Sequence, residues 1–503
     1  MKKTILTVIG ALAACGTLAA QTAVPNKISE DLTLHAGTDY LLNGYTYVLD
    51  GATLTIEPGV HVYANEDTGV NASALIITRG GKIMAQGSPT APIIFEPISA
   101  KDVDLGPDDT GMWGGVIVLG KGKLNSNALG VWTGYPTQDI EGMVPATEDL
   151  PLINFGGEDN ADNSGVLSYI SIRNGGISLS EGNEINGLTL GGVGSGTTIN
   201  HIEVFANKDD AVEIFGGAVN LDHIVAAFSY DDSLDLDEGY LGHVQYYFVI
   251  QRKGAGTNTD KGDKGGEWDG NDLPNTATPL MLVKLANATF VGMGTESSNT
   301  AFNIRHNGAG QVYNSIFVEY DKMIQLDEDS DGACLARYNN GDDIFSGNIW
   351  FSSTPANNDA TALAVSGSGL VSPMNTFFSG TNQIANPGLA ISRVAGAYAL
   401  DVTPADDSVA VTSEAATVPT ELEQTSFKGA FDPYYNWAIG WTKLYSDGYF
   451  VVEGSWFDHP KWGWIYLNSG TLDDGSYVYF KNTDQWMWVA ASDSTGFWSY
   501  VFD

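Results

Sequence analysis

The amino-acid sequence predicts an all-β protein, in which a parallel β-helix is followed by a small antiparallel β-meander. Three observations predict this fold. Short apolar runs are separated by Gly, Asn and Asp, part of the chain repeats with a period of 22 residues, and tryptophan is concentrated after residue 445. The 503 residues, 43% of them hydrophobic, suffice for one large domain with a substantial core and a smaller one after it.

Strand-like runs follow one another from about residue 30. Examples are ATLTIEPGVHVYA, ALIITRGGKIMAQG, LSYISIRNGG, INHIEVFAN and VQYYFVIQ. Runs of this length with turn residues between them, and no convincing amphipathic helix, indicate strands throughout. The 60 glycines fit a chain with many tight turns.

The repeat is clearest between Asn207 and Tyr240, where Asp209-Asp210 and Asp231-Asp232 stand 22 residues apart. Further matched pairs are His201 and His223, Val212 and Leu234, Glu213 and Asp235, and Ile214 and Leu236. A period of 22 residues is about one coil of a parallel β-helix, in which aligned residues stack at the strand spacing of ~4.8 Å. The repeat therefore favours a β-helix over a sandwich or a barrel, with stacked coils supplying the core.

The N-terminus, MKKTILTVIGALAACGTLAAQ, has two lysines, an apolar run and then small residues, and this pattern predicts a signal peptide over residues 1–20. Two cleavage sites compete. Simple export places the cut near Ala19 or Ala20, whereas Leu12-Ala13-Ala14-Cys15 resembles a lipobox that would make Cys15 a lipidated first residue. Apart from Cys15, Cys334 is the only cysteine, so we expect no internal disulfide in the exported chain.

The formal charge of −38, from 61 acidic and 23 basic residues, is the strongest compositional signal. Such a charge repels phosphate backbones and anionic membrane surfaces, so nucleic acid is an improbable partner and cations suit the protein better. No segment after the N-terminus approaches the ~20 apolar residues of a membrane span.

Strand alternation assigns a direction to the side chains of the repeat. Val212 and Ile214 should point into the bore of the helix, as should Leu234 and Leu236. Glu213, Asp235 and Asp237 should then point outward, beside the turns that carry the paired aspartates.

This outward acidic pattern has three interpretations. The first is a solvated turn, because Asp favours turns through local hydrogen bonds. The second is a cation site, because carboxylates one strand spacing apart repel unless solvent, a proton or a cation intervenes. The third is a polysaccharide hydrolase or lyase with Asp231, Asp232 and Asp235 as acid and base, and with His201 and His223 nearby. The absence of a nearby Lys or Arg cluster argues against catalysis.

A second cation candidate lies in LDEDSDGACL. Asp327, Asp329, Asp331 and Gly332 reproduce the opening of a calcium loop, in which alternate oxygen atoms converge and glycine permits the sharp turn. Tyr338 stands where a twelve-residue loop requires a bidentate Glu, so the segment is not an EF-hand. A shorter calcium loop or an acidic surface loop remain the alternatives.

The motif GGEWDGND lies in a Gly/Lys/Asp-rich excursion from Lys253 to Asn275. Trp268 between Glu267 and Asp269 would suit stacking on a sugar ring, with hydrogen bonds from the sugar hydroxyl groups to the carboxylates. The alternative is a Trp that fastens its loop to the scaffold.

Several segments also carry a family resemblance: TLTIEPGV, ALIITRGGKIMAQGSPTAPIIF, MWGGVIVLG, NEINGLTLGGVGSGTTINHIEVFANKDDAVEIFGG, GGEWDG and FKGAFDPYYNWAIGWTKL. The chain resembles, over roughly residues 45–445, a family of secreted bacterial surface proteins, some of them lipoproteins. The resemblance implies a right-handed parallel β-helix of pectin-lyase-like fold and export from the cell. It assigns no activity and no catalytic residue.

After residue 445 the sequence concentrates aromatic residues. Six of the 12 tryptophans lie there: Trp456, Trp462, Trp464, Trp486, Trp488 and Trp498. WGWIYL, YVYF and WMWV, with turns between them, predict a β-meander that resembles the aromatic C-terminal modules of some bacterial surface proteins. Its tryptophans form either a core or a platform for sugars.

The sequence thus predicts a signal peptide at 1–20, a β-helix domain at 21–445 and a Trp-rich module at 446–503. We expect an extracellular or surface protein without a membrane span that binds a polysaccharide or cell-envelope glycan without cleaving it, assisted by calcium. A polysaccharide-degrading enzyme is one alternative. A structural surface protein displayed through its C-terminal module is another.

Overall fold

A computed structural model provides the structure of the chain. It describes residues 21–67, 71–125, 137–180, 183–252, 262–271, 275–294, 299–326, 333–355, 358, 364–366, 380–394 and 397–446, and the C-terminal strands at 456–459, 463–467, 476–480, 485–490 and 499–501. None of the helices in these ranges has the length and apolar character needed to cross a bilayer.

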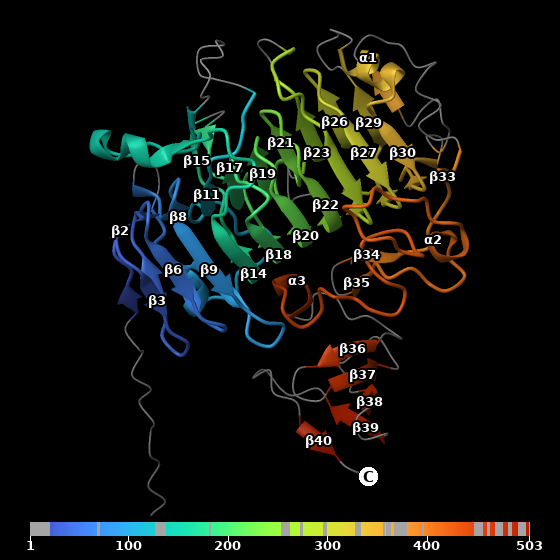
Figure 1. The fold of residues 1–503 in the computed structure, drawn as a ribbon. Helices are drawn as coiled ribbons and strands as arrows, with labels where there is room; N and C mark the ends of the chain where they lie inside the picture. Colours follow the sequence, from blue (N-terminus) through green and yellow to red (C-terminus); the bar gives the residue numbers. More distant parts are fainter. Residues whose placement is uncertain are drawn as a thin grey trace, which may run out of the picture.

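The described chain is a right-handed parallel β-helix, whose successive coils lie side by side from the blue to the yellow segments in Figure 1. Two parallel sheets run along it. Sheet B contains β2 (Lys27–Ile28), β5 (Tyr45–Val48), β8 (Ala74–Ile77), β11 (Val116–Leu119), β17 (Leu188–Gly191), β19 (Val212–Phe215), β21 (Asp235–Asp237), β23 (Lys264–Asp269), β26 (Thr300–Arg305), β29 (Lys322–Leu326) and β32 (Ala364–Ser366).

Sheet A forms the other two faces of the helix. Its strands are β1 (Thr22–Ala23), β3 (Leu32–Leu34), β4 (Tyr40–Leu42), β6 (Thr53–Ile56), β7 (His61–Ala64), β9 (Lys82–Gln86), β10 (Ile93–Pro97), β14 (Gly165–Arg173), β18 (Thr198–Phe205), β20 (Asn220–Ala227), β22 (His243–Ile250), β24 (Val283–Ala286), β25 (Thr289–Val291), β27 (Gly310–Tyr313), β28 (Ile316–Val318), β30 (Ile344–Ser346), β31 (Ile349–Phe351) and β33 (Gln383–Ile384).

Four long strands of sheet A bend from one face to the next. Each bends at a residue with positive φ: Tyr169 in β14 (50°), His201 in β18 (51°), His223 in β20 (56°) and Tyr246 in β22 (56°). Their rings stack on the outside of the bend, with centroids 4.2 to 4.5 Å apart. The predicted match of His201 with His223 is therefore a direct contact.

The structure confirms the 22-residue register. Glu213 pairs with Asp235 and Ile214 with Leu236 between β19 and β21, and Thr198 pairs with Asn220 between β18 and β20. Asp209 also lies against Asp231, since side-chain oxygen atoms of Asp209, Asp210 and Asp231 lie within 4.8 Å of one another.

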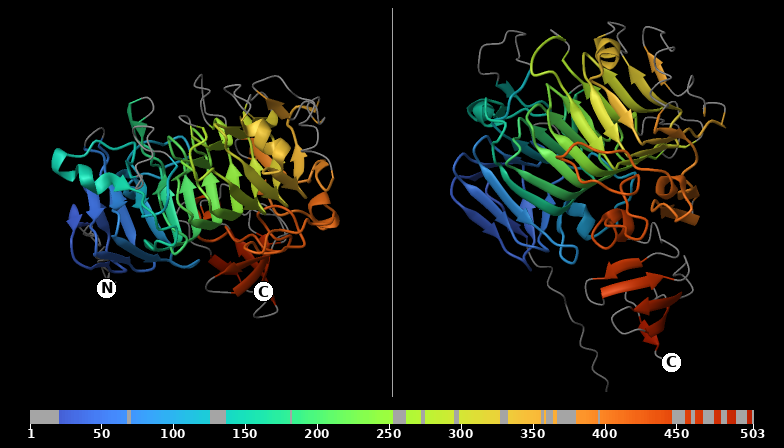
Figure 2. Two further views of the ribbon diagram at one scale, coloured as in Figure 1. Left: turned by 45° about the horizontal axis from the view of Figure 1, so that its top comes forward. Right: turned by 45° about the vertical axis from the view of Figure 1, so that its right-hand side comes forward.

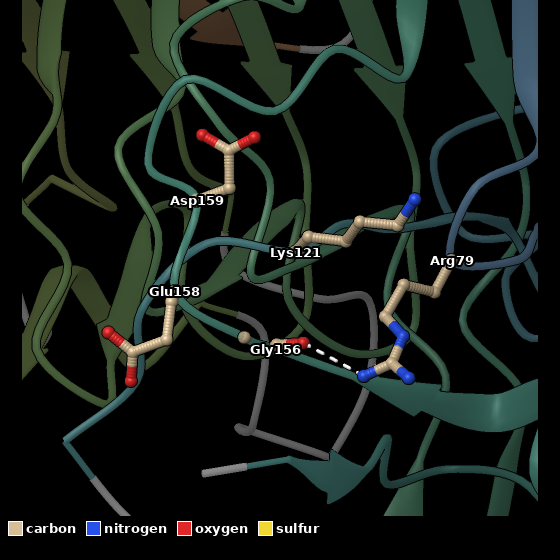
Figure 3. A pocket seen from close by; sticks show the side chains of 6 residues that line it. Arg79, Lys121, Gly156, Glu158 and Asp159 are labelled. Carbon is tan, nitrogen blue, oxygen red and sulfur yellow. Dashed lines mark hydrogen bonds between the residues drawn. The ribbon is translucent and has the colours of Figure 1, made fainter. Parts of the chain in front are cut away.

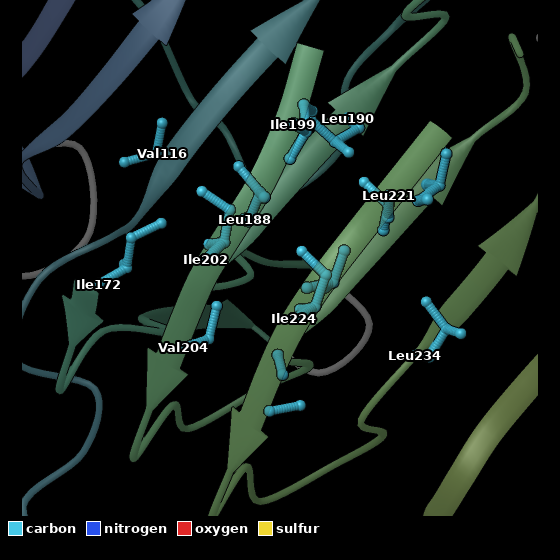
Figure 4. Packing of buried hydrophobic residues seen from close by; sticks show 14 of the residues in the cluster. Val116, Ile172, Leu188, Leu190, Ile199, Ile202, Val204, Leu221, Ile224 and Leu234 are labelled. Atoms are coloured by element: carbon cyan, nitrogen blue, oxygen red, sulfur yellow. The ribbon is translucent and has the colours of Figure 1, made fainter. Parts of the chain in front are cut away.

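The core fills the bore of the helix, as strand alternation predicted. Val212, Ile214, Leu234 and Leu236 have no exposed surface and belong to one apolar cluster that runs along the bore. Figure 4 shows part of this cluster, with Leu188 and Leu190 from sheet B facing Ile202 and Ile224 from sheet A. Stacking of such residues stabilises each coil against its neighbours.

The parallel ladder does not fill the whole of the predicted β-helix domain at 21–445. Parallel pairing begins at Thr22, and in the described chain it ends at Ile384. It is followed by an antiparallel hairpin of β34 (Ala390–Val394) and β35 (Ala397–Asp401), the short helix α2 (Val409–Thr412), irregular chain and the short helix α3 (Lys443–Ser446).

This final segment, residues 385–394 and 397–446, packs on the outside of sheet A, along one side of the helix in Figure 2. Phe431, Trp437 and Trp441 cover the outward apolar residues of the sheet, among them Val225. The outer side of sheet A carries apolar residues there, and the hydrophobic effect favours covering them. At its end, the N–H groups of Lys443 and Leu444 donate to the buried Glu203 carboxylate, at 2.7 and 2.9 Å.

Smaller elements complete the chain. They are two antiparallel pairs, β12 (Gln138–Asp139) with β13 (Asn154–Phe155) and β15 (Ser178–Ser180) with β16 (Asn183–Glu184), two 3₁₀ helices at Ile98–Lys101 and Thr147–Ile153, and the helix α1 (Ala333–Asn340). The C-terminal strands β36 (Trp456–His459), β37 (Gly463–Leu467), β38 (Ser476–Phe480), β39 (Gln485–Ala490) and β40 (Ser499–Val501) pair antiparallel in sequence order. The predicted meander is therefore present.

We predict that Leu236→Ala lowers the free energy of unfolding by about 2–5 kcal/mol, because it removes a buried side chain and leaves a cavity in the bore. Leu241→Ala is the matched control, since Leu241 is 39% exposed. Denaturant titration of both variants measures the difference. Equal losses in the two variants would contradict the placement of Leu236 in the core.

Candidate functional site

The outer face of sheet B carries apolar side chains at the start of the helix and acidic side chains further along it. Over the early strands it is apolar, and an excursion of the chain between β11 and β14 covers it. The buried cluster at this interface contains Tyr45, Tyr47, Ile76, Ile117, Leu119, Ile140, Met143, Ile153, Phe155 and Phe215. On β19, β21 and β23 outward positions carry carboxylates, and Asn303 on β26 and Gln325 on β29 follow them in register.

Register brings these carboxylates into line. Glu213 on β19 pairs with Asp235 on β21, and Asp235 pairs with Glu267 on β23. Side-chain oxygen atoms lie within 4.8 Å of one another in the group Asp210, Glu213 and Asp235, and also in the group Asp232, Asp235 and Glu267. We call these five residues the acidic row; Asp235 belongs to both groups.

Two members of the acidic row also hold the coils together. The Asp210 carboxylate accepts a hydrogen bond from the N–H of Asp232 at 2.8 Å, and Asp232 accepts one from the N–H of Lys264 at 2.7 Å. The N–H of Asp210 in turn donates to the side chain of Asn186. Each carboxylate thus binds the backbone of the next coil, which gives Asp210 and Asp232 a structural role.

Basic residues lie at the downstream end of the row. Lys264 Nζ lies 2.7 Å from Glu267 and 3.8 Å from Asp232. Arg305 lies 2.8 Å from both Glu267 and Asp269, and His306 Nδ1 lies 2.6 Å from Asp269. The expectation that no Lys or Arg cluster lies near the acids is therefore wrong, because the next two coils bring Lys264 and Arg305 back to the row.

Burial and mutual repulsion perturb the acids. Burial raises the pKa of Asp210, Glu213 and Asp235 well above the ordinary range, and neighbouring carboxylates raise each of them further. Burial also raises the pKa of Asp232, although Lys264 opposes this shift. The row thus contains acids that hold protons at higher pH than usual unless a cation compensates them.

Of the predicted catalytic residues, Asp232 and Asp235 lie within the acidic row. Asp231 is exposed and has its carboxylate against those of Asp232 and Asp263. His201 and His223 do not lie beside the acids, because their stack is on the outside of sheet A under Trp437 and Trp441. Burial, followed by the nearby His223, lowers the pKa of His201 to about 3.

The predicted sugar-binding motif is a strand rather than a loop. Alternation along β23 places Glu267 and Asp269 outward, where both meet Arg305, but turns Trp268 into the bore with no exposed surface. A Cβ atom at Gly310 would overlap the Trp268 ring, so the next coil leaves room for the indole. Trp268 therefore fills the core and cannot stack on a sugar.

Asp327, Asp329 and Asp331 lie outside the described residues, so the predicted calcium loop stays a prediction. Strand β29 ends at Leu326, directly before it.

We predict that Asp235→Asn raises the melting temperature in the presence of a chelator, and more at pH 7 than at pH 5. The folded-state pKa of Asp235 is raised above the ordinary value of about 4, so ionising this carboxyl costs stability as pH rises through the folded pKa. Asparagine cannot ionise and avoids that cost. Thermal melts at the two pH values measure the effect, with Glu30→Gln as a control that removes an exposed carboxylate. An equal rise in melting temperature at both pH values would contradict the raised pKa of Asp235.

The comparisons with known proteins agree with this architecture. The family model described as a pectate-lyase-like β-helix domain matches residues 26–387, which contain nearly all of the parallel coils and the whole acidic row. No curated protein and no solved structure matches the chain. The chain belongs to the pectate-lyase-like β-helix domain family.

Proposed function

We propose that the protein binds a polysaccharide through a calcium ion held by the acidic row. The observation that supports this most is the convergence of Asp210, Glu213 and Asp235, whose side-chain oxygen atoms lie within 4.8 Å of one another. Calcium takes six to eight oxygen ligands with flexible geometry, and carboxylates are its preferred protein ligands.

The two ends of the row differ in charge compensation. At the downstream end, Lys264 and Arg305 already neutralise Glu267. At the upstream end, the neighbours that most affect the pKa of Asp210 and Glu213 are all carboxylates. The Oδ1 atom of Asp235 is buried and accepts no hydrogen bond. A cation between these oxygen atoms would relieve their repulsion, which favours the upstream end as the calcium site.

Three protein carboxylates leave part of the calcium coordination sphere for other oxygen atoms. Sugar hydroxyl groups can fill it, so the ion would join the sheet to a glycan without a catalytic step. The signal peptide predicted for residues 1–20 supports a place outside the cell, where a polysaccharide or a cell-envelope glycan is the ligand. The second predicted calcium loop, at Asp327 to Asp331, would add to this dependence on calcium.

We predict that millimolar calcium raises the melting temperature of the exported protein relative to chelator, because a ligand that binds only the folded state stabilises it. Asp235→Asn and Glu213→Gln should each remove most of the shift, while Asp329→Asn tests the loop separately and Glu30→Gln is the control. Glycan pull-down by the same variants should fall in parallel. An unchanged melting temperature would contradict the calcium site, and an equal response to magnesium would indicate general charge screening.

A specific observation favours a second candidate function, polysaccharide cleavage. Glycosidic hydrolysis needs a carboxylic acid that keeps its proton beside a carboxylate that is ionised. Burial raises the pKa of Asp232 and Asp235, whereas Glu267 lies between the cations Lys264 and Arg305. This arrangement places acids of raised pKa in the same row as a carboxylate that two cations contact.

The two candidates are separated by incubation with neutral and acidic polysaccharides in calcium, following reducing ends and unsaturated products. The binding proposal predicts no new product and retention of the polysaccharide. Cleavage that is lost in Asp235→Asn but kept in Glu30→Gln would replace the binding proposal with the enzyme.

A further inference from the structure

A second polar site lies upstream of the acidic row, at the turns that follow β8 and β11. It is a pocket of about 440 Å³, a size typical of small-ligand sites. Its lining residues are Arg79, Lys121, Gly156, Gly157, Glu158 and Asp159. Arg79 and Lys121 come from adjacent coils, since β8 and β11 are neighbours in sheet B.

The charged side chains of the pocket are separated by sign. Figure 3 shows Arg79 and the Lys121 side chain on one side, and the carboxylates of Glu158 and Asp159 on the other. Glu158 lies 3.5 Å from Lys123, and Asp159 accepts a hydrogen bond from the N–H of Ala161 at 2.9 Å. Neither carboxylate forms an ion pair with Arg79 or Lys121 within the described residues, and the nearest cation to Glu158 is Lys123.

A backbone contact orients Arg79. Arg79 Nη1 donates to the carbonyl oxygen of Gly156 at 3.0 Å, which orients the guanidinium while its other N–H groups stay available. No ion pair joins Arg79 or Lys121 to a carboxylate in the described part of the chain, although acids outnumber bases by 61 to 23. Arg79 is half-buried and Lys121 is exposed, and two cations without a partner carboxylate at one pocket of so acidic a protein indicate a site for an anion.

We propose that this pocket binds an oxyanion group, a carboxylate or a sulfate ester, carried by a small or sparsely charged ligand. The planar guanidinium of Arg79 suits two parallel hydrogen bonds to such a group, and the Lys121 ammonium adds a point charge beside it. The net charge of −38 repels a densely charged polyanion, so the ligand carries few anionic groups. The pocket uses no residue of the acidic row, so this inference is independent of the calcium proposal.

The test is binding of glucuronate, glucose 6-sulfate and neutral glucose to the full exported chain in chelator, measured by ligand-observed NMR and calorimetry. We expect at least one anionic sugar to bind and glucose not to bind, because the site recognises the oxyanion. Comparing the two anionic sugars distinguishes the carboxylate from the sulfate.

Arg79→Gln and Lys121→Gln should each weaken that binding by at least about tenfold, the loss expected for a hydrogen bond to a charged group. Arg79→Lys should also weaken it, because lysine keeps the charge but loses the planar fork. Lys82→Gln removes an exposed cation outside the pocket and should leave binding unchanged. Melting temperatures confirm that each variant is folded. Failure of both anionic sugars to bind, or equal binding by all variants, would overturn the proposal.

Discussion

Parallel backbone pairing at a fixed register is the constraint on which the rest of the structure depends. Because each coil repeats the residues of the one before it, any outward side chain is brought within one strand spacing of its equivalent. At β19, β21 and β23 the outward residue is acidic in three consecutive coils, so Glu213, Asp235 and Glu267 form one row. The fold cannot separate these charges without breaking the ladder, and they must be compensated by protons or cations.

The apolar bore maintains this register. A slip of one residue would move Ile214 and Leu236 to the solvent side and bring Glu213 and Asp235 into the bore, so hydrophobic burial opposes every shift that would relieve the repulsion outside. The side-chain ladder acts in the same direction, since Asp210 and Asp232 each bind the backbone of the next coil. The apolar core therefore holds the carboxylates of the acidic row close together in spite of their repulsion. This repulsion is strongest at the upstream end of the row, because Lys264 and Arg305 pair with Glu267 at the other end.

The register and the direction of the side chains could be predicted because two consecutive coils have the same length and the same pattern of acidic and apolar residues around Asp209 and Asp231. The cations could not, because Lys264 follows Asp232 by 32 residues and Arg305 follows Asp269 by 36, so the 22-residue period is lost. The glycines around Trp268 predict a loop, whereas the alternation within β23 turns its side chain into the bore. Trp437 and Trp441 pack across sheet A through tertiary contacts. Aromatic residues in a sequence do not show which surface they will cover, so this packing could not be predicted.

A crystal structure of the exported protein grown in calcium, with anomalous data, tests the central claim most directly. The account predicts one ion between the carboxylates of Asp210, Glu213 and Asp235, at 2.3–2.6 Å from its oxygen ligands, with Lys264 and Arg305 still paired to Glu267. A row free of bound cation at saturating calcium, with the same carboxylate positions as in chelator, would contradict it.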